Sequence, residues 1–115
     1  MRMKNQEMGK HLLLEVYDAE FDALNDYIFL KDLLFDGIMK SKSKILNTII
    51  HKFDPHGCTI IFALAESHVS IHTWPEKGCL SADFYTCGGK DPKIIAKSLI
   101  EGLKSKKHRI RMINR

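Results

Sequence analysis

CTIIFALAESHVSIHTW (58–74) holds two extended segments joined by a short polar break. The first, CTIIFALA (58–65), is a continuous apolar run of strand length, which is typical of a buried strand. The second, HVSIHTW (68–74), is rich in β-branched and aromatic residues, so we expect it to stay extended. These residues therefore predict two consecutive strands with polar side chains gathered between them.

The segments on either side predict the rest of a sheet. LSADFYTC (80–87) alternates, with Asp83 and Tyr85 on one face and Ala82 and Phe84 on the other. Turns are expected at 54–57 and 75–78, where Pro and Gly set the backbone. The predicted strands are 10–17, 45–53, 58–65, 68–74, 80–87 and 108–113.

Two helices are predicted, over residues 21–40 and 91–103. Asp91 and Pro92 suit the N-cap and the first helical position of the second helix. Spacing assigns the inward side of each helix. The expected inward residues of the first helix are Phe21, Leu24, Ile28, Phe35 and Ile38, with Tyr27, Leu30, Leu33 and Leu34 widening this stripe. Those of the second are Ile94, Ile95, Ser98, Leu99, Gly102 and Leu103.

The order β-α-β-β-β-β-α-β predicts an α+β fold, a two-layer sandwich of one antiparallel sheet with both helices on one face. The other face of the sheet would be open. Because the strands are so apolar, we expect a second copy to cover it, giving a homodimer with a four-layer αββα arrangement.

Composition limits the class of protein. The chain has 115 residues, enough for a single domain over 1–115. Its 44% apolar and 28% charged residues exclude a disordered, collagen-like or coiled-coil chain. The polar start at 1–10 predicts no secretory signal, and no apolar run predicts a membrane helix. With three cysteines and no CxxC, we expect a cytoplasmic protein without disulfides or a cysteine zinc site.

The net charge of +4 comes from the C-terminal end. Residues 101–115 hold six Lys or Arg against one acid, and the rest of the chain holds 12 against 13. This end would either contact nucleic-acid phosphates or form a solvated helix end, and the second interpretation is favoured. A non-enzymatic, basic nucleic-acid-binding module stays as the alternative of another class.

The polar residues at 66–76 suggest three kinds of chemistry. On one strand His68 and His72 would lie about 13 Å apart, too far to share an ion, so no metal site is predicted. Ser67 lacks the GxSxG context of a hydrolase nucleophile. The third kind uses the backbone itself, because a serine hydroxyl can attack the carbonyl before it.

Such an attack at Glu66-Ser67 would form an ester. β-Elimination of the ester and hydrolysis of the dehydroalanine would leave a pyruvoyl group and ammonia. The pyruvoyl ketone can form a Schiff base with an amine and act as an electron sink. Composition alone does not single this chemistry out, and a solvated polar strand end is the other interpretation.

AESHVSIHTWPE (65–76), followed by DFYTCG (83–88), resembles the prokaryotic S-adenosylmethionine decarboxylase proenzymes. GKHLLLEVYD (9–18) and HKFDPHG (51–57) resemble the same family. The resemblance covers nearly the whole chain. It implies a self-processing, pyruvoyl-dependent decarboxylase that converts S-adenosylmethionine to the aminopropyl donor of spermidine and other polyamines.

The resemblance also implies residue roles. Cleavage would fall between Glu66 and Ser67, giving a β chain of residues 1–66 and an α chain of residues 67–115. Ser67 would become the pyruvoyl cofactor. His72 would be the base for processing, and Cys87 would return a proton to the substrate carbon, a role that suits a thiol.

Substrate contacts are implied for three residues. Phe53 would stack on the adenine ring. Trp74 and Glu76 would lie beside the site, and Glu76 would hold the ribose hydroxyls. For Phe53 and Trp74, packing in the core or at an interface is the other interpretation. In this family the sites lie at or near the dimer interface.

The chain departs from the family pattern at several positions. Asp54 stands where an apolar residue is common, Thr59 where Ser is expected and Cys79 where Tyr is expected, and the RIRMINR ending is unusual. Some relatives on this scaffold act on arginine or ornithine, and Asp54 would suit a cationic substrate. Decarboxylation of arginine or ornithine is therefore the alternative within the same chemistry.

Overall fold

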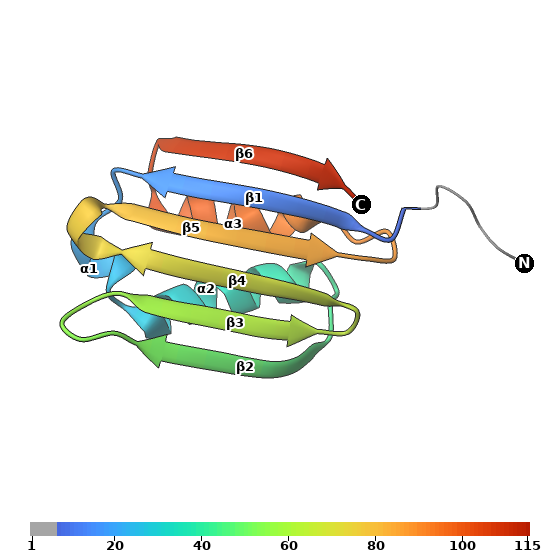
Figure 1. Cartoon of the computed structure of the whole chain (residues 1–115), viewed down its shortest axis with the longest axis horizontal. Coiled ribbons are helices and arrows are strands. Elements are labelled where there is room, and N and C mark those ends of the chain that lie inside the picture. Colours follow the sequence, from blue (N-terminus) through green and yellow to red (C-terminus); the bar gives the residue numbers. More distant parts are fainter. Residues whose placement is uncertain (1–6) are drawn as a thin grey trace, which may run out of the picture.

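The computed structural model describes residues 7–115, over which six strands form one antiparallel sheet in the order β2-β3-β4-β5-β1-β6 (Figure 1). Residues 1–6, in the polar start expected to carry no signal, lie outside the described part. The strands are β1 (Lys10–Tyr17), β2 (Ile45–Lys52), β3 (Cys58–Leu64), β4 (Ser67–Trp74), β5 (Cys79–Thr86) and β6 (Lys107–Asn114). The helices are α1 (Phe21–Leu24), α2 (Tyr27–Lys40), the short 3₁₀ turn η1 (Pro75–Lys77) and α3 (Pro92–Leu103).

The predicted α+β fold is confirmed. Helices α2 and α3 lie side by side behind the sheet in Figure 1 and cover its central strands. The alternation expected for 80–87 is also confirmed, because Ala82 and Phe84 are buried under the helices while Asp83 and Tyr85 are partly exposed on the other face. No helix among residues 7–115 is long and apolar enough to cross a membrane.

The prediction of one helix over 21–40 is wrong in one respect. The helix breaks between α1 and α2, where the Asp26 side chain accepts a hydrogen bond from the Phe29 amide at 3.0 Å and caps a new helix. The break resets the helical period. Phe21, Ile28 and Phe35, which were expected to face inward, are therefore exposed.

The buried face of the two long helices matches the expected set only in part. In α3 the expected inward residue Ile94 is exposed and Ala96 is buried instead. Gly37 lets the helices approach closely, since a Cβ there would lie 2.9 Å from the Cα of Ile95. The buried residues are Leu24 in α1, Leu30, Leu34, Gly37 and Ile38 in α2, and Pro92, Ile95, Ala96, Leu99 and Leu103 in α3.

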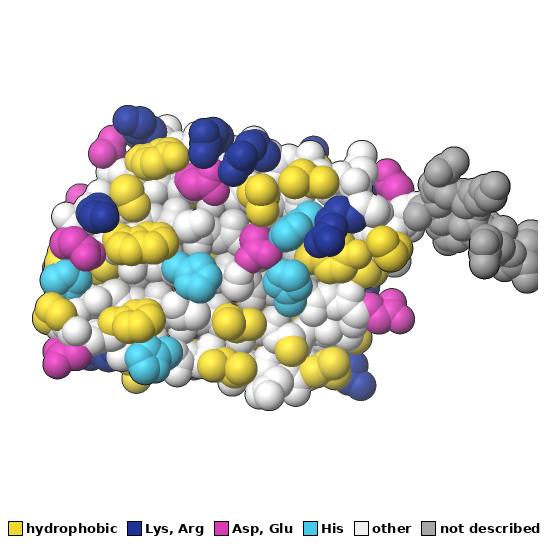
Figure 2. All heavy atoms as spheres, viewed as in Figure 1, with side chains coloured by type: hydrophobic (Ala, Val, Ile, Leu, Met, Phe, Trp, Pro, Cys, Tyr) yellow, Lys and Arg dark blue, Asp and Glu magenta, His cyan; other side chains and the backbone are white. Residues whose placement is uncertain are grey.

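The face of the sheet opposite the helices carries no covering element within residues 7–115. Figure 2 shows this face, with hydrophobic and histidine side chains over the middle strands and Lys and Arg toward the upper edge. Ile49, Trp74 and Ile113 are 56%, 41% and 45% exposed. The open face predicted from the sequence is therefore present, and it holds the side chains of the candidate site.

Candidate functional site

The Glu66–Ser67 peptide lies at the tip of the hairpin that joins β3 to β4. Ser67 is the first residue of β4 and pairs with Leu64 of β3. Glu66 has a φ of 63°, in the left-handed region that non-glycine residues rarely adopt. Such a conformation costs on the order of 1–3 kcal/mol and is typical of functional positions. The peptide predicted to be cleaved is thus exposed and locally strained.

Cys87 lies directly beside this peptide. Its Sγ donates a hydrogen bond to the carbonyl oxygen of Glu66, at 2.9 Å. The contact forms because Cys87 immediately follows β5, the neighbour of β4 in the sheet. The structure therefore brings together Glu66, Ser67 and Cys87, which the sequence places twenty residues apart. The hollow beside them is lined by Glu7, Met8, Glu66, Tyr85, Cys87, Gly88 and Gly89.

A second group of the predicted residues lines an open cavity of about 270 Å³ at the other end of β4. Phe53 and Trp74 are 47% and 41% exposed, so neither packs in the core of the chain. The Glu76 carboxylate lies 3.5 Å from Nε2 of His56. The lining residues are Phe53, His56, Cys58, Thr59, His72, Thr73, Trp74 and Glu76.

His72 belongs to this second group. Its Nδ1 lies 2.9 Å from the Thr59 hydroxyl, because the two residues are direct cross-strand partners in β3 and β4. Thr59 stands where the family pattern expects Ser. Its side chain still places a hydroxyl against the predicted processing base. Asp54, by contrast, is exposed and lies outside the set of described residues that line the cavity.

The structure does not bring His72 to Ser67 within one chain. The two residues are five positions apart on one strand, or about 16 Å at roughly 3.3 Å per residue. In Figure 1 the Glu66–Ser67 hairpin lies at the right-hand end of β4, and Trp74 ends the strand on the left. The predicted site is therefore split into two halves at opposite ends of the open face.

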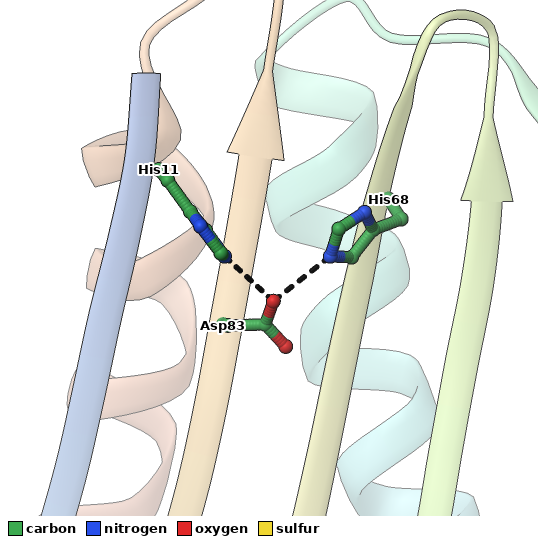
Figure 3. A group of neighbouring side chains, drawn as sticks. All are labelled: His11, His68 and Asp83. Carbon is green, nitrogen blue, oxygen red and sulfur yellow. Dashed lines mark hydrogen bonds and ion pairs between the residues drawn. The ribbon is translucent and has the colours of Figure 1, made fainter. Parts of the chain in front are cut away.

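Between the halves lies a cluster that the sequence did not predict, shown in Figure 3. Nε2 of His11 and Nε2 of His68 donate hydrogen bonds to Oδ2 of Asp83, at 2.7 and 2.8 Å. The Ser70 hydroxyl donates to the other oxygen, Oδ1. Burial alone would raise the pKa of Asp83, but the hydrogen bonds from Ser70, His68 and His11 together hold it below its ordinary value of 3.8.

The basic C-terminal residues lie only partly at a helix end. Lys104 is the C-cap of α3, whereas Lys107, Arg109 and Arg111 belong to the edge strand β6, which pairs with β1. Arg109 and Arg111 contact the Glu15 carboxylate of β1, at 2.8 and 3.4 Å. Part of the positive charge is therefore paired with an acidic side chain on the surface of the sheet.

The chain is similar to a set of known proteins. The sequence model of the S-adenosylmethionine decarboxylase family matches residues 10–115. The S-adenosylmethionine decarboxylase proenzyme of Bacillus cytotoxicus is 39% identical over 100 residues, covering 86% of this chain and 77% of that protein. The proenzyme of Prochlorococcus marinus is 39% identical over 109 residues, covering 94% and 87%.

A solved structure is similar in fold. The crystal structure of the adenosylmethionine decarboxylase from Aquifex aeolicus matches with a TM-score of 0.88 at 29% sequence identity. The match covers 96% of this chain and 92% of that one. The likeness in fold therefore extends over nearly the whole chain.

Proposed function

Because the chain belongs to the S-adenosylmethionine decarboxylase family, we propose that it is a self-processing decarboxylase of S-adenosylmethionine, which supplies the aminopropyl donor for spermidine synthesis. The observation that carries the proposal is the contact between the Cys87 thiol and the Glu66 carbonyl, at 2.9 Å. It joins the predicted proton donor to the predicted cleavage position. The names of the relatives, which call them proenzymes of S-adenosylmethionine decarboxylase, support this substrate over arginine or ornithine.

Cleavage begins with the hydroxyl of Ser67. It attacks the carbonyl carbon of Glu66, and the acyl group moves from nitrogen to oxygen. Negative charge then develops on the Glu66 oxygen, where the Cys87 thiol already donates a hydrogen bond. The left-handed backbone of Glu66 favours the reaction, because breaking this peptide releases its strain.

The residues around position 67 fit a pyruvoyl group. A ketone at the first residue of β4 would begin a new chain end at an exposed hairpin tip, with the Cys87 thiol beside it. When present, this group supplies a ketone that binds the substrate amine and accepts the electrons released as CO2 leaves. Cys87 then holds the proton that returns to the substrate carbon.

The cavity at the other end of β4 suits the adenosyl part of the substrate. Phe53 offers an exposed aromatic face for the adenine ring. Glu76 offers a carboxylate, held near His56, for the ribose hydroxyls. Within one chain this cavity lies too far from Ser67 for a single small substrate to reach both.

We therefore propose that two copies pack through their open faces, related by a two-fold axis. If that axis runs at right angles to the strands, this isologous contact places the His72 end of each chain opposite the Ser67 end of the other. The partner subunit's His72 would then remove the α-proton of Ser67 for the elimination step. Burial of the exposed Ile49, Trp74 and Ile113 would stabilise the contact.

His72 needs a free ring nitrogen for this role. We assign the tautomer in which Nδ1–H donates to the Thr59 hydroxyl, leaving Nε2 to accept a proton.

We also propose a cytoplasmic location, since Cys58, Cys79 and Cys87 are free thiols, as is typical of a reducing compartment.

Intact mass spectrometry of the purified chain tests the proposal directly. We expect two pieces, residues 1–66 and 67–115, the second carrying a pyruvoyl end. Ser67→Ala should give one uncleaved chain, and the control Ser98→Ala on α3 should cleave as the wild type does. An uncleaved wild-type chain, above all one with salt-sensitive binding to RNA or DNA, would contradict the proposal and favour a binding module.

Release of labelled CO2 tests the substrate. We expect release from carboxyl-labelled S-adenosylmethionine and none from arginine or ornithine. Release from arginine or ornithine alone, by a cleaved chain, would retain the pyruvoyl chemistry but overturn the substrate.

A further inference from the structure

We propose that His11, His68 and Asp83 bind a divalent first-row transition metal ion on the open face of the sheet. The three side chains come from three adjacent strands, β1, β4 and β5, and point toward one another (Figure 3). One atom from each, two imidazole nitrogens and one carboxylate oxygen, all lie within 4.8 Å of one another. This donor set binds metals in many proteins.

The strand register fixes this arrangement. His68 and His11 both pair with Tyr85, from opposite sides of β5, so the two histidines flank that strand at the same level. Asp83 lies two residues earlier on the same face of β5, and both rings lean toward it. Sites built on paired strands hold their geometry better than sites on loops.

The distances suit an ion with small adjustments. Nε2 of each histidine lies within 2.8 Å of Oδ2 of Asp83. In a tetrahedral site with bonds of about 2.0–2.1 Å, neighbouring donor atoms are about 3.3 Å apart. The donors therefore need to separate by roughly half an ångström. Ser70 binds the other oxygen of Asp83 and so orients the carboxylate, as outer-shell partners of metal ligands do.

The donor types indicate the class of metal. Two imidazoles and one carboxylate favour zinc, cobalt, nickel or iron over magnesium and calcium, which prefer oxygen ligands. The side chains of His11, Asp83 and His68 are 17%, 27% and 42% exposed. An ion can therefore reach them in the single chain, before two copies pack through their open faces, and a water molecule would complete its coordination.

The sequence argument against a metal concerned only His68 and His72 on a single strand. His11 and Asp83 reach His68 from other strands, which no local spacing reveals. Because His68 directly follows Ser67, a bound ion would hold the start of β4 against β5 and β1, next to the cleavage position. The site rests on this geometry alone and does not depend on cleavage at Ser67.

Titration of the metal-free full-length chain with Zn²⁺ by calorimetry tests the proposal, with Co²⁺ absorption as a second measurement. We expect one ion per chain and the visible bands of a low-coordinate Co²⁺ site. Asp83→Asn and His11→Gln should each weaken binding by more than the roughly 10–100-fold that loss of an outer-shell partner causes. Ser70→Ala should fall within that 10–100-fold range.

Two matched controls separate this site from others. His51→Gln, on β2 of the same face, and Cys87→Ser should bind Zn²⁺ as the wild type does. Ser67→Ala should also bind it, so failure of cleavage and failure of metal binding are distinguishable. Zn²⁺ should raise the melting temperature of the wild type but not that of Asp83→Asn. A cooperative melting transition of Asp83→Asn in the absence of Zn²⁺ would show that this variant is folded.

Equal Zn²⁺ affinity in the wild type, Asp83→Asn and His11→Gln would overturn the proposal. So would the absence of Zn²⁺ binding by the wild type at millimolar metal, which would leave a hydrogen-bonded cluster only. Loss of binding in Cys87→Ser alone would assign the ion to the thiol and would also overturn it.

Discussion

The thiol of Cys87 donates a hydrogen bond to the carbonyl oxygen of Glu66, at 2.9 Å, across two neighbouring strand ends. This contact gives one side chain two proposed tasks. Before cleavage it stabilises charge on the oxygen of the reacting peptide. After cleavage it donates the proton that replaces CO2.

The two tasks of Cys87 are separable by substitution. Cys87→Ala should lower decarboxylation by about 10²–10⁴-fold, the usual value of a positioned acid. It should slow cleavage by less than the roughly 10²–10³-fold of a full oxyanion donor, because a thiol donates weakly. Cys87→Ser should restore cleavage but not turnover. Gel time courses measure the rate of cleavage, and CO2 release measures the rate of decarboxylation. If Cys87→Ala lowered both rates equally, the two tasks would not be separable.

Thr59 should act on cleavage through His72. Thr59→Ala removes the hydroxyl 2.9 Å from Nδ1 and leaves the ring free to rotate or to change tautomer. Loss of one such hydrogen bond, about 0.5–1.5 kcal/mol, predicts cleavage slower by roughly 2- to 13-fold. Thr59→Ser should cleave at close to the wild-type rate. If Thr59→Ala and the wild type cleave equally fast, the hydroxyl has no part in positioning His72.

Phe53 should contribute to substrate binding and not to the chemical step. Stacking of a base on an aromatic ring is worth about 1–3 kcal/mol, so Phe53→Ala should raise KM by roughly 5- to 150-fold with kcat little changed. Phe35→Ala, an equally exposed aromatic on the helix side of the molecule, should leave both constants unchanged. A fall in kcat with constant KM would remove Phe53 from the adenine site.

Much of the fold is readable from the sequence because each strand carries its own signal. The apolar runs and the alternation at 80–87 identify buried strands, and Asp91-Pro92 marks the start of α3. The inward faces of the helices were less predictable. Asp26 caps a new helix, and its buried face centres on Leu30 and Leu34, which were expected only to widen the stripe, while Ile28 and Phe35 are exposed.

The site was predictable only where its residues lie in one motif. AESHVSIHTWPE (65–76) identifies the cleavage position and the residues that follow it. Because the segment is extended, as the sequence predicted, Ser67 and His72 lie about 16 Å apart, and the motif does not show how the two halves of the site would meet. The cluster around Asp83 was missed because its members meet only through strand pairing, which depends on the order of strands in the sheet.

The buried thiol of Cys58 predicts a change of stability at alkaline pH. Burial raises its pKa above the ordinary value of 9.0, and the hydrogen bond with Thr73 only partly offsets this effect. Above about pH 9 the unfolded chain loses the thiol proton more readily than the folded chain does, so the stability that Cys58 contributes below pH 9 is lost as pH rises.

Cys58→Ala should therefore be less stable than the wild type at pH 7, and the difference in unfolding free energy should narrow above about pH 9. Cys58→Val also lacks the thiol but fills the space. Its unfolding free energy should likewise rise relative to that of the wild type above about pH 9. Urea unfolding at a series of pH values measures the differences. Differences that stay constant from about pH 7 to 10 would contradict the assignment.

The separation of Ser67 from His72 predicts that two inactive variants restore one another. Ser67→Ala lacks the reacting hydroxyl, and His72→Gln lacks the base, so neither should cleave alone. In a mixed dimer, the Ser67 of the His72→Gln chain would face the intact His72 of its partner. After co-expression in equal amounts, random pairing should allow about half of the His72→Gln chains to be cleaved.

Intact mass distinguishes the two chains, so the prediction has a specific pattern. Pieces should come only from the His72→Gln chain, while the Ser67→Ala chain stays whole. Co-expression of Ser67→Ala with a double variant, Ser67→Ala and His72→Gln, should give no pieces. If His72 instead acted on its own chain through a rearranged hairpin, no mixture would restore cleavage, because each chain would still lack one of its two groups. Pieces from the His72→Gln chain would therefore locate the processing site between two copies of the open face.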